Sequence, residues 1–237
     1  GSLPRPDALV RSMWAAADGV PVDLAALDAQ IDAAIADGVR RQVDAGVSVV
    51  NDGEMSKPSY ATYVQHRLSG FGGASVRSYH FQDLVEFPKS AEIVASNPGR
   101  RKRSAPACTG PIEVKDLEPA RRDMARLAKA AQAAGAEATF SSAASPGVVS
   151  LFFGNEHYPD HEAYVFAIAE AMRAEYELIA ESGALVQLDC PDLAMGRHSA
   201  YAHLDDDAFG ETIATHVEAL NHAVRNIPAE KIRMHLC

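Results

Sequence analysis

The chain has 237 residues and a mass of 25.3 kDa, with 47% hydrophobic and 23% charged residues. This composition excludes the disordered and fibrous classes. The formal charge of −10 argues against a general affinity for nucleic acid, because phosphate backbones are bound by concentrated lysine and arginine. No apolar stretch reaches the roughly 18 residues of a membrane helix, and the first residues carry no signal-peptide pattern, so we expect a soluble cytoplasmic protein with no membrane partner.

Apolar runs that end in turn-forming or polar residues predict buried strands. In chain order these runs are 46–55, 106–111, 136–147, 183–191 and 231–237. Alanine-rich segments with apolar residues at three- and four-residue spacing predict helices over 23–46, 117–135, 160–183 and 205–226. Asp23 and the acidic run at 205–207 are expected at helix N-termini, where acidic side chains cap the backbone N–H groups.

This alternation of strands and helices predicts an α/β fold. The loops after the strands carry polar and acidic side chains that could form an active site, which favours a (β/α)8 TIM barrel over a doubly wound sheet. We expect one domain over 1–237, with an excursion at about 71–103. Even with a strand upstream of the first residue, only about six strand positions are present, so we expect an incomplete barrel. Its exposed sheet edges predict association, including a homo-oligomer.

The last run ends on the residues Met-His-Leu-Cys, which place His235 and Cys237 two positions apart. On a strand, side chains at i and i+2 point to the same side, so both can reach one zinc ion. The alternative is a hydrogen-bonded histidine beside a buried cysteine. The chain has three cysteines, an odd number, and they lie far apart in the sequence, which argues against a disulfide framework.

The other strand ends also carry polar side chains. Asp52 and Glu54 follow one predicted strand, Asp189 and Cys190 follow another, and Ser2 lies in the opening loop. Each of them singly is typical of a turn or helix cap. Their shared position at the strand ends is what favours a site, because carboxylates can bind a substrate ammonium and a serine can hold a carboxylate.

Six segments together resemble the catalytic C-terminal barrel of cobalamin-independent methionine synthase and its short single-domain relatives. They are GSLPRP, VVNDGEMSKPSYATYVQHRLSGF, TGPI, ASPGVVSLFF, VQLDCPDLA and MHLC, in the family's order over nearly the whole chain. The short relatives include the epoxyalkane:coenzyme M transferases, so the resemblance leaves the substrate open.

The resemblance implies a zinc cofactor bound by His235 and Cys237. It also implies that Ser2, Glu54 and Asp189 hold the amino acid substrate, and that the segment from Thr109 and Gly110 to the following proline lies on the side of the methyl donor. One departure concerns the substrate: where the methionine synthases have Asp-Glu-Pro, this chain has Cys190 between Asp189 and a proline. The family's remaining zinc ligands, a Glu and a second Cys, and its catalytic histidine are not in this chain.

These observations predict a zinc-dependent thiol methyltransferase that resembles 5-methyltetrahydrofolate–homocysteine S-methyltransferase. Its partners would be a small-molecule thiol and a methyl or alkyl donor. Zinc would hold the substrate sulfur as a thiolate at neutral pH. Two alternatives stay open: a zinc-dependent alkyltransferase of the epoxyalkane:coenzyme M type, and a metal-free, non-catalytic barrel.

Overall fold

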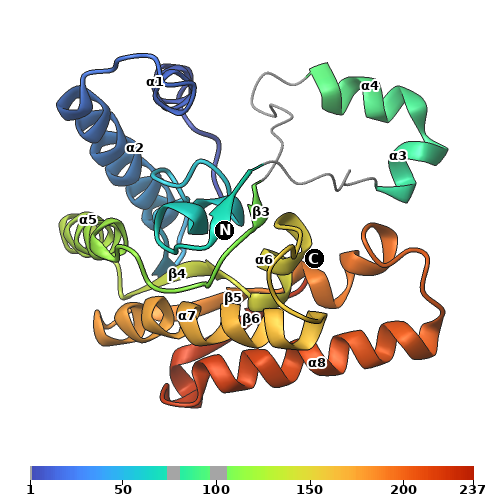
Figure 1. The fold of residues 1–237 in the computed structure, drawn as a ribbon. Coiled ribbons are helices and arrows are strands. Elements are labelled where there is room, and N and C mark those ends of the chain that lie inside the picture. Colours follow the sequence, from blue (N-terminus) through green and yellow to red (C-terminus); the bar gives the residue numbers. More distant parts are fainter. Residues whose placement is uncertain (1, 74–80, 97–105) are drawn as a thin grey trace.

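A sheet of four parallel strands forms the centre of the computed structural model, which describes residues 2–73, 81–96 and 106–237 (Figure 1). The strand order is β1-β4-β5-β6, with bounds β1 (Val49–Val50), β4 (Ala138–Ala144), β5 (Leu185–Asp189) and β6 (Ile232–His235). Each of these strands lies within one of the predicted apolar runs. The α/β fold with a parallel sheet is therefore confirmed, whereas closure into an eight-stranded barrel stays a prediction.

Helices cover one side of this sheet. Figure 1 shows α5, α7 and α8 along it and α2 beside β1. Outside the segment 71–103, the described α-helices are α1 (Asp7–Ala17), α2 (Leu24–Asp44), α5 (Glu118–Ala134), α6 (Pro146–Phe152), α7 (His161–Glu181) and α8 (Asp206–Val224). Short 3-10 segments are η1 (Thr62–His66), η2 (Pro191–Leu193), η3 (Met195–His198) and η4 (Ala229–Lys231). No helix in the described ranges is long and apolar enough to cross a membrane.

Local sequence signals set the ends of the four predicted helices. The carboxylates of Asp23, Asp160 and Asp205 accept hydrogen bonds from backbone N–H groups in the first turns of α2, α7 and α8. Such caps satisfy donors that have no partner within the helix. At the other end of α5, Gly135 has φ +69°, the left-handed conformation that glycine adopts without a Cβ penalty. The predicted cap role of the acidic run at 205–207 is confirmed for Asp205.

The run 106–111 contains a buried strand, as predicted, but this strand does not pair with the parallel sheet, so its expected place in that sheet is wrong. Its residues form β3 (Ala107–Cys108), which pairs antiparallel with β2 (Phe71–Gly72) in a separate two-stranded sheet. The physical reason lies in the backbone partners: Thr109 N donates to Gly70 O and Cys108 N to Gly154 O, so neither N–H pairs with a strand of the parallel sheet. Val50 instead pairs directly with Thr139 of β4.

The excursion expected at about 71–103 contains β2 and two short helices, α3 (Gln82–Glu86) and α4 (Pro88–Ser96). Its remaining parts, 74–80 and 97–105, lie outside the described residues. Figure 1 shows α3 and α4 standing apart from the helices around the sheet. Val85 of α3, Ile93 of α4 and Phe87 between the two helices are exposed.

The two faces of the sheet differ in chemistry. Ala143, Val186 and Leu188 are buried in the hydrophobic core together with residues of α5, α7 and α8. Because successive side chains of a strand alternate between faces, the neighbouring residues Ser142 and Gln187 lie on the opposite face. That face carries polar side chains, which are buried as well. The fold thus provides an apolar layer under the helices and a polar layer on the far side.

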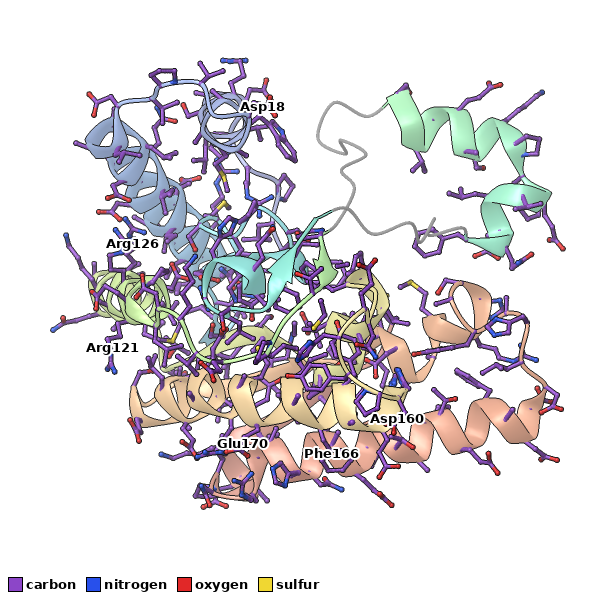
Figure 2. All side chains as sticks on the ribbon, in the orientation of Figure 1. Asp18, Arg121, Arg126, Asp160, Phe166 and Glu170 are labelled. Atoms are coloured by element: carbon purple, nitrogen blue, oxygen red, sulfur yellow. The ribbon has the colours of Figure 1, made fainter. Side chains whose placement is uncertain are left out.

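Helix pairs add ion pairs at the surface. Figure 2 shows Phe166 and Glu170 on the part of α7 next to α8. The Glu170 carboxylate lies 2.8 Å from His222 Nε2 and 3.1 Å from Arg225 Nη2 of α8 and its C-cap. These contacts join the middle of α7 to the C-terminal end of α8.

Candidate strand-end site

Asp189 and His235 lie side by side at the carboxyl ends of β5 and β6. The parallel register pairs these two residues directly, and Asp189 Oδ1 is 3.3 Å from His235 Nδ1. Asp189 is buried with 6% of its surface exposed, whereas the His235 side chain is about half exposed, at 52%. The two residues that were predicted for different roles, substrate binding and metal binding, are therefore neighbours.

A row of hydrogen-bonded polar side chains on β4, β5 and β6 leads to the Asp189 carboxylate. Gln187 Nε2 donates to Asp189 Oδ1 at 3.0 Å and lies 3.1 Å from Ser142 Oγ of β4. Arg233 Nε of β6 donates to Gln187 Oε1 at 3.0 Å, and its guanidinium lies over the ring of Phe140. Since hydrogen bonds to a carboxylate stabilise its charged form and fix its orientation, this row holds Asp189 in place.

Glu54 occupies a strained position after β1. Its φ of +57° is in the left-handed region, where a residue other than glycine is uncommon and costs of order 1 kcal/mol. Asp52 Oδ1 accepts from Glu54 N at 3.0 Å, and Arg5 Nη2 donates to Glu54 O at 2.7 Å. The side chain of Asp52 and the guanidinium of Arg5 therefore hold a conformation that the backbone alone would disfavour.

The Glu54 carboxyl group is buried and carries an unfavourable charge. Only 4% of Glu54 is exposed, and no described residue donates a hydrogen bond to its carboxylate. Burial raises the pKa of this carboxyl above its ordinary value; the Lys57 ammonium opposes the shift, while the carboxylates of Asp189 and Asp52 add to it. The Asp189 carboxylate is therefore one of the charges that act on Glu54.

Ser2 lies close to the Glu54 loop, whereas Thr109 and Gly110 belong to the second sheet. Leu3 N donates to Gly53 O at 3.0 Å, which places the exposed Ser2 beside the turn that precedes Glu54. Thr109 N and Gly110 N both donate to Gly70 O, at 2.8 and 3.2 Å. In the described part of the chain, no hydrogen bond or ion pair links Thr109 or Gly110 to the carboxylates at the strand ends.

The cysteines differ in accessibility. Cys237 is exposed two residues after His235, whereas Cys108 and Cys190 are buried. Burial raises the pKa of the Cys190 thiol, and the nearby Asp192 carboxylate raises it further; burial also raises the pKa of Cys108. No group of three or more His, Cys, Asp or Glu side chains that could hold a metal ion occurs in the described ranges. The predicted pair, His235 and Cys237, thus supplies two donors.

A second polar cluster lies directly behind the strand ends. Ser145, the residue after β4, donates from Oγ to Asp192 Oδ1 at 2.6 Å, and Asp192 Oδ2 is 2.9 Å from His216 Nδ1 of α8. His216 Nε2 lies 2.9 Å from His161 Nε2 at the start of α7. Asp192 and His216 are almost fully buried, so the cluster joins β4, η2, α7 and α8 through hydrogen bonds shielded from water.

A buried ion cluster lies on the β1 side of the same strand ends. Arg67 contacts Asp123 of α5 and Glu175 of α7, at 2.6 Å each, and Tyr63 Oη donates to Glu175 at 2.7 Å. The ring of Tyr63 also lies 4.6 Å from the ammonium of Lys57. Burial raises the pKa of the Tyr63 hydroxyl well above its ordinary value, so this group stays protonated as a donor.

Sequence reasoning missed Gln187 and both buried clusters. Gln187 could have been found, because period-two alternation within its strand puts it on the same face as Asp189. The ion cluster around Arg67 and the pair of Asp192 with His216 join residues far apart in the chain, and a single sequence has no spacing that signals such contacts.

Solved structures with the same fold are found among methionine synthases. A B12-independent methionine synthase from Shewanella sp. W3-18-1, determined in complex with selenomethionine, superposes with a TM-score of 0.66 at 18% identity over 92% of this chain and 54% of its own. A protein of Listeria monocytogenes proposed to be a vitamin-B12-independent methionine synthase gives a TM-score of 0.68 at 20% identity, over 100% of this chain and 63% of its own. No family model matches the chain, and no curated protein matches it.

These similarities support the predicted family at the level of the fold. At 18–20% identity they show a shared architecture, of the type found in methionine synthases. The chain spans between about half and two thirds of the length of these two structures. The activity, the metal and the substrates of the whole proteins are therefore taken up as proposals below.

Proposed function

We propose that this chain carries the strand-end site of a zinc-dependent thiol methyltransferase, in which a small amino acid thiol accepts the methyl group. The observation that carries the proposal is the pair of buried carboxylates, Glu54 after β1 and Asp189 at the end of β5, at the same edge of the parallel sheet in a methionine-synthase-type fold. A buried carboxylate without a donor is costly unless a cation binds it. The Lys57 ammonium offsets the burial of Glu54 only in part, and the ammonium group of an amino acid would supply a further cation.

Each residue has a separate task in this proposal. Glu54 binds the substrate ammonium and is held in its left-handed conformation for that purpose by Asp52 and Arg5. Asp189 completes the negative surface and orients the His235 ring through Nδ1. Ser2, which is exposed beside the Glu54 turn, donates a hydrogen bond from its hydroxyl to the substrate carboxylate.

The residues present fit zinc in their donor type. The contact of His235 Nδ1 with Asp189 leaves Nε2 as the nitrogen for a metal, an arrangement typical of metal-binding histidines. Cys237 offers an exposed thiol two residues later. Bound zinc would stabilise the substrate sulfur as a thiolate at neutral pH. The sulfur–methyl bond forms as the bond between the methyl carbon and its donor breaks, and the thiol proton leaves to solvent or to the donor.

The carboxylates favour an amino thiol over coenzyme M. Coenzyme M carries a sulfonate and no ammonium group, so two buried carboxylates would repel it. We therefore rank the epoxyalkane:coenzyme M transferase second. The folate or other methyl donor would approach from the side of Thr109 and Gly110, as the family resemblance implies.

The test uses the full-length protein with zinc content and product measured on the same sample. We expect conversion of homocysteine to methionine with 5-methyltetrahydrofolate, and weak or no conversion of 4-sulfanylbutanoate, which lacks the amino group. Glu54→Gln should raise the KM for homocysteine about tenfold or more and reduce this discrimination, since a charged hydrogen bond contributes about 1.5–3 kcal/mol. Asp206→Asn, at an exposed carboxylate of α8, is the matched control.

Two results would overturn the proposal. Consumption of coenzyme M with an epoxide, but not of homocysteine with a methyl donor, would assign the chain to the second class. A folded full-length protein that binds neither zinc nor any thiol would indicate a non-catalytic barrel.

A further inference from the structure

We infer that His161 and His216 form a pH-sensitive contact, which joins the start of α7 to α8 and opens when both imidazole rings are protonated. This contact lies behind the strand-end site and does not depend on the proposed methyl transfer. The inference rests on the distance between the two rings, on the partners of His216 and on the burial of both side chains.

The two imidazole rings meet through the same nitrogen atom. His161 is the first residue of α7, and Figure 2 shows the preceding Asp160 at this end of the helix. His161 Nε2 lies 2.9 Å from His216 Nε2 of α8, which is a hydrogen-bond distance. Such a contact needs one proton, because one nitrogen must donate and the other must accept. The two Nε2 atoms therefore hold a single proton between them while the rings touch.

The Asp192 carboxylate determines the protonation of the other nitrogen of His216. Asp192 Oδ2 is 2.9 Å from His216 Nδ1, and Ser145 Oγ donates to Asp192 Oδ1 at 2.6 Å. An ionised carboxylate only accepts, so His216 Nδ1 carries a proton. Because Asp192 and His216 are almost fully buried, this hydrogen bond is shielded from water and fixes the orientation of the His216 ring.

These two constraints limit the charge that the ring pair can carry. Without net charge, His216 Nε2 accepts from His161 Nε2. With one positive charge the contact persists, because one ring is doubly protonated and the other still offers a lone pair at Nε2. With two positive charges both Nε2 atoms carry a proton, and two N–H groups that face each other cannot form a hydrogen bond. Histidine ordinarily titrates between pH 5 and pH 8, so acidification supplies the second charge.

Several titratable or charged groups lie on the elements packed around the pair. They are Asp192 of η2 with the Cys190 thiol before it, Tyr201 and Arg197 of the segment before α8, and Asp160 and Glu162 at the start of α7. Helix α6, which also packs against α8, has no titratable side chain. Tyr201 Oη lies 3.5 Å from His216 Nε2, and Arg197 is paired with the Asp206 carboxylate at 3.0 Å. The Asp192 carboxylate offsets one positive charge on the pair, and a second charge repels the first.

Burial determines which ring moves when the contact opens. His216 is held in the core by Asp192, whereas His161 is partly exposed at the end of a helix. We therefore expect the His161 ring to turn toward solvent and the first turns of α7 to lose one of their contacts with α8. Segments with fewer buried contacts open more readily, so the amide hydrogens at this end of α7 should exchange faster at acidic pH.

The test measures the two rings and the helix end directly. The histidine rings of the full-length protein are labelled with ¹⁵N, and NMR spectra are recorded from pH 8 to pH 5. At pH 8 we expect a protonated Nδ1 in His216 and a ¹⁵N–¹⁵N coupling across the Nε2 contact, and at pH 5 this coupling should be lost. Amide exchange at residues 164–168, corrected for its intrinsic pH dependence, should become about threefold faster or more over the same range.

Variants at position 161 separate this contact from other effects of acid. His161→Gln places an amide near the position of Nε2 that can donate or accept, so it should keep slow exchange at residues 164–168 at both pH values. His161→Phe keeps a ring without nitrogen and should give fast exchange at both pH values. His222→Gln is the matched control, because His222 contacts Glu170 of α7 at 2.8 Å near the other end of α8. This control should keep the response of the wild type.

Three results would overturn the inference. The first is a coupling that is absent at pH 8 or persists at pH 5. The second is equal acceleration of exchange in His161→Gln and the wild type, which would place the acid-sensitive group elsewhere. The third is zinc binding at both Nε2 atoms in His235→Ala, which lacks a proposed strand-end ligand, because this would assign the pair to a metal site. Failure of methyl transfer changes none of these measurements, so the two proposals fail separately.

Discussion

Asp189 and His235 are register partners at the ends of two parallel strands, and their side chains meet at 3.3 Å. The buried carboxylate faces one ring nitrogen of an exposed imidazole, so the orientation of the ring is determined by a residue of the neighbouring strand. This relationship links the carboxylate proposed for substrate binding to the proposed metal ligand.

Asp189→Asn should weaken zinc binding about 10- to 100-fold, because the partner of a metal-binding histidine orients the ring and raises its basicity. The measurement is zinc affinity by competition with a chromophoric chelator in the full-length protein. Asp206→Asn serves as the control, since the Asp206 side chain is 95% exposed. Equal zinc affinity in the Asp189 variant and the wild type would contradict a role of Asp189 in orienting His235.

Glu54→Gln should stabilise the protein at pH 7 and have little effect near pH 4. Burial raises the pKa of Glu54 in the folded state, so the folded protein retains a proton that the unfolded chain has already lost. Stability is therefore lost as pH rises above the unfolded value of about 4.3 through the folded value. The neutral glutamine avoids this loss.

The free energy of unfolding in urea, measured for both proteins from pH 4 to pH 7, checks this prediction. The difference between variant and wild type should grow with pH. A difference independent of pH would mean that Glu54 is stabilised as a charged group in the folded state.

Gly147→Ala should destabilise the protein by about 3 kcal/mol or more, through overpacking of a buried polar contact. A Cβ at Gly147 would lie 2.0 Å from Asp192 Oδ2 and 2.4 Å from His216 Nδ1. Gly210→Ala in α8 is the matched control: no atom lies within 4 Å of its Cβ, so it should stabilise by about 0.5–1 kcal/mol. Urea denaturation compares the two, and equal effects would mean that α6 can shift away from Asp192.

Arg67→Met should cost about 3–5 kcal/mol of unfolding free energy, because it leaves Asp123 and Glu175 as buried charges without their cation. Arg40→Met is the control, since the Arg40 side chain is 58% exposed and solvent screens its ion pairs on α2, so this variant should change the free energy of unfolding little. A loss of similar size in both variants would show that the Arg67 cluster is solvated when opened.

Part of the candidate site could be predicted because it follows strand ends. The apolar runs that precede Asp189 and His235 predict both residues at strand ends, and the turn after β1 predicts Glu54. The alternation of side chains along β5 also predicts Gln187 on the face of Asp189. The second strand run, at 106–111, was wrongly assigned to the parallel sheet, because two residues of strand character do not reveal which partner takes their backbone groups.

The sequence by itself determined the helices and their ends, since Asp23, Asp160, Asp205 and Gly135 act on backbone groups within a few residues. It also determined the parallel α/β pattern through the period of its apolar residues. Only the tertiary structure decided the register that joins Asp189 to His235, the burial of Lys57 against the ring of Tyr63, and the contact of Asp192 with His216. These contacts depend on packing between segments that are distant in the chain. Burial and geometry, which a single sequence does not contain, determine which partner a charged group meets.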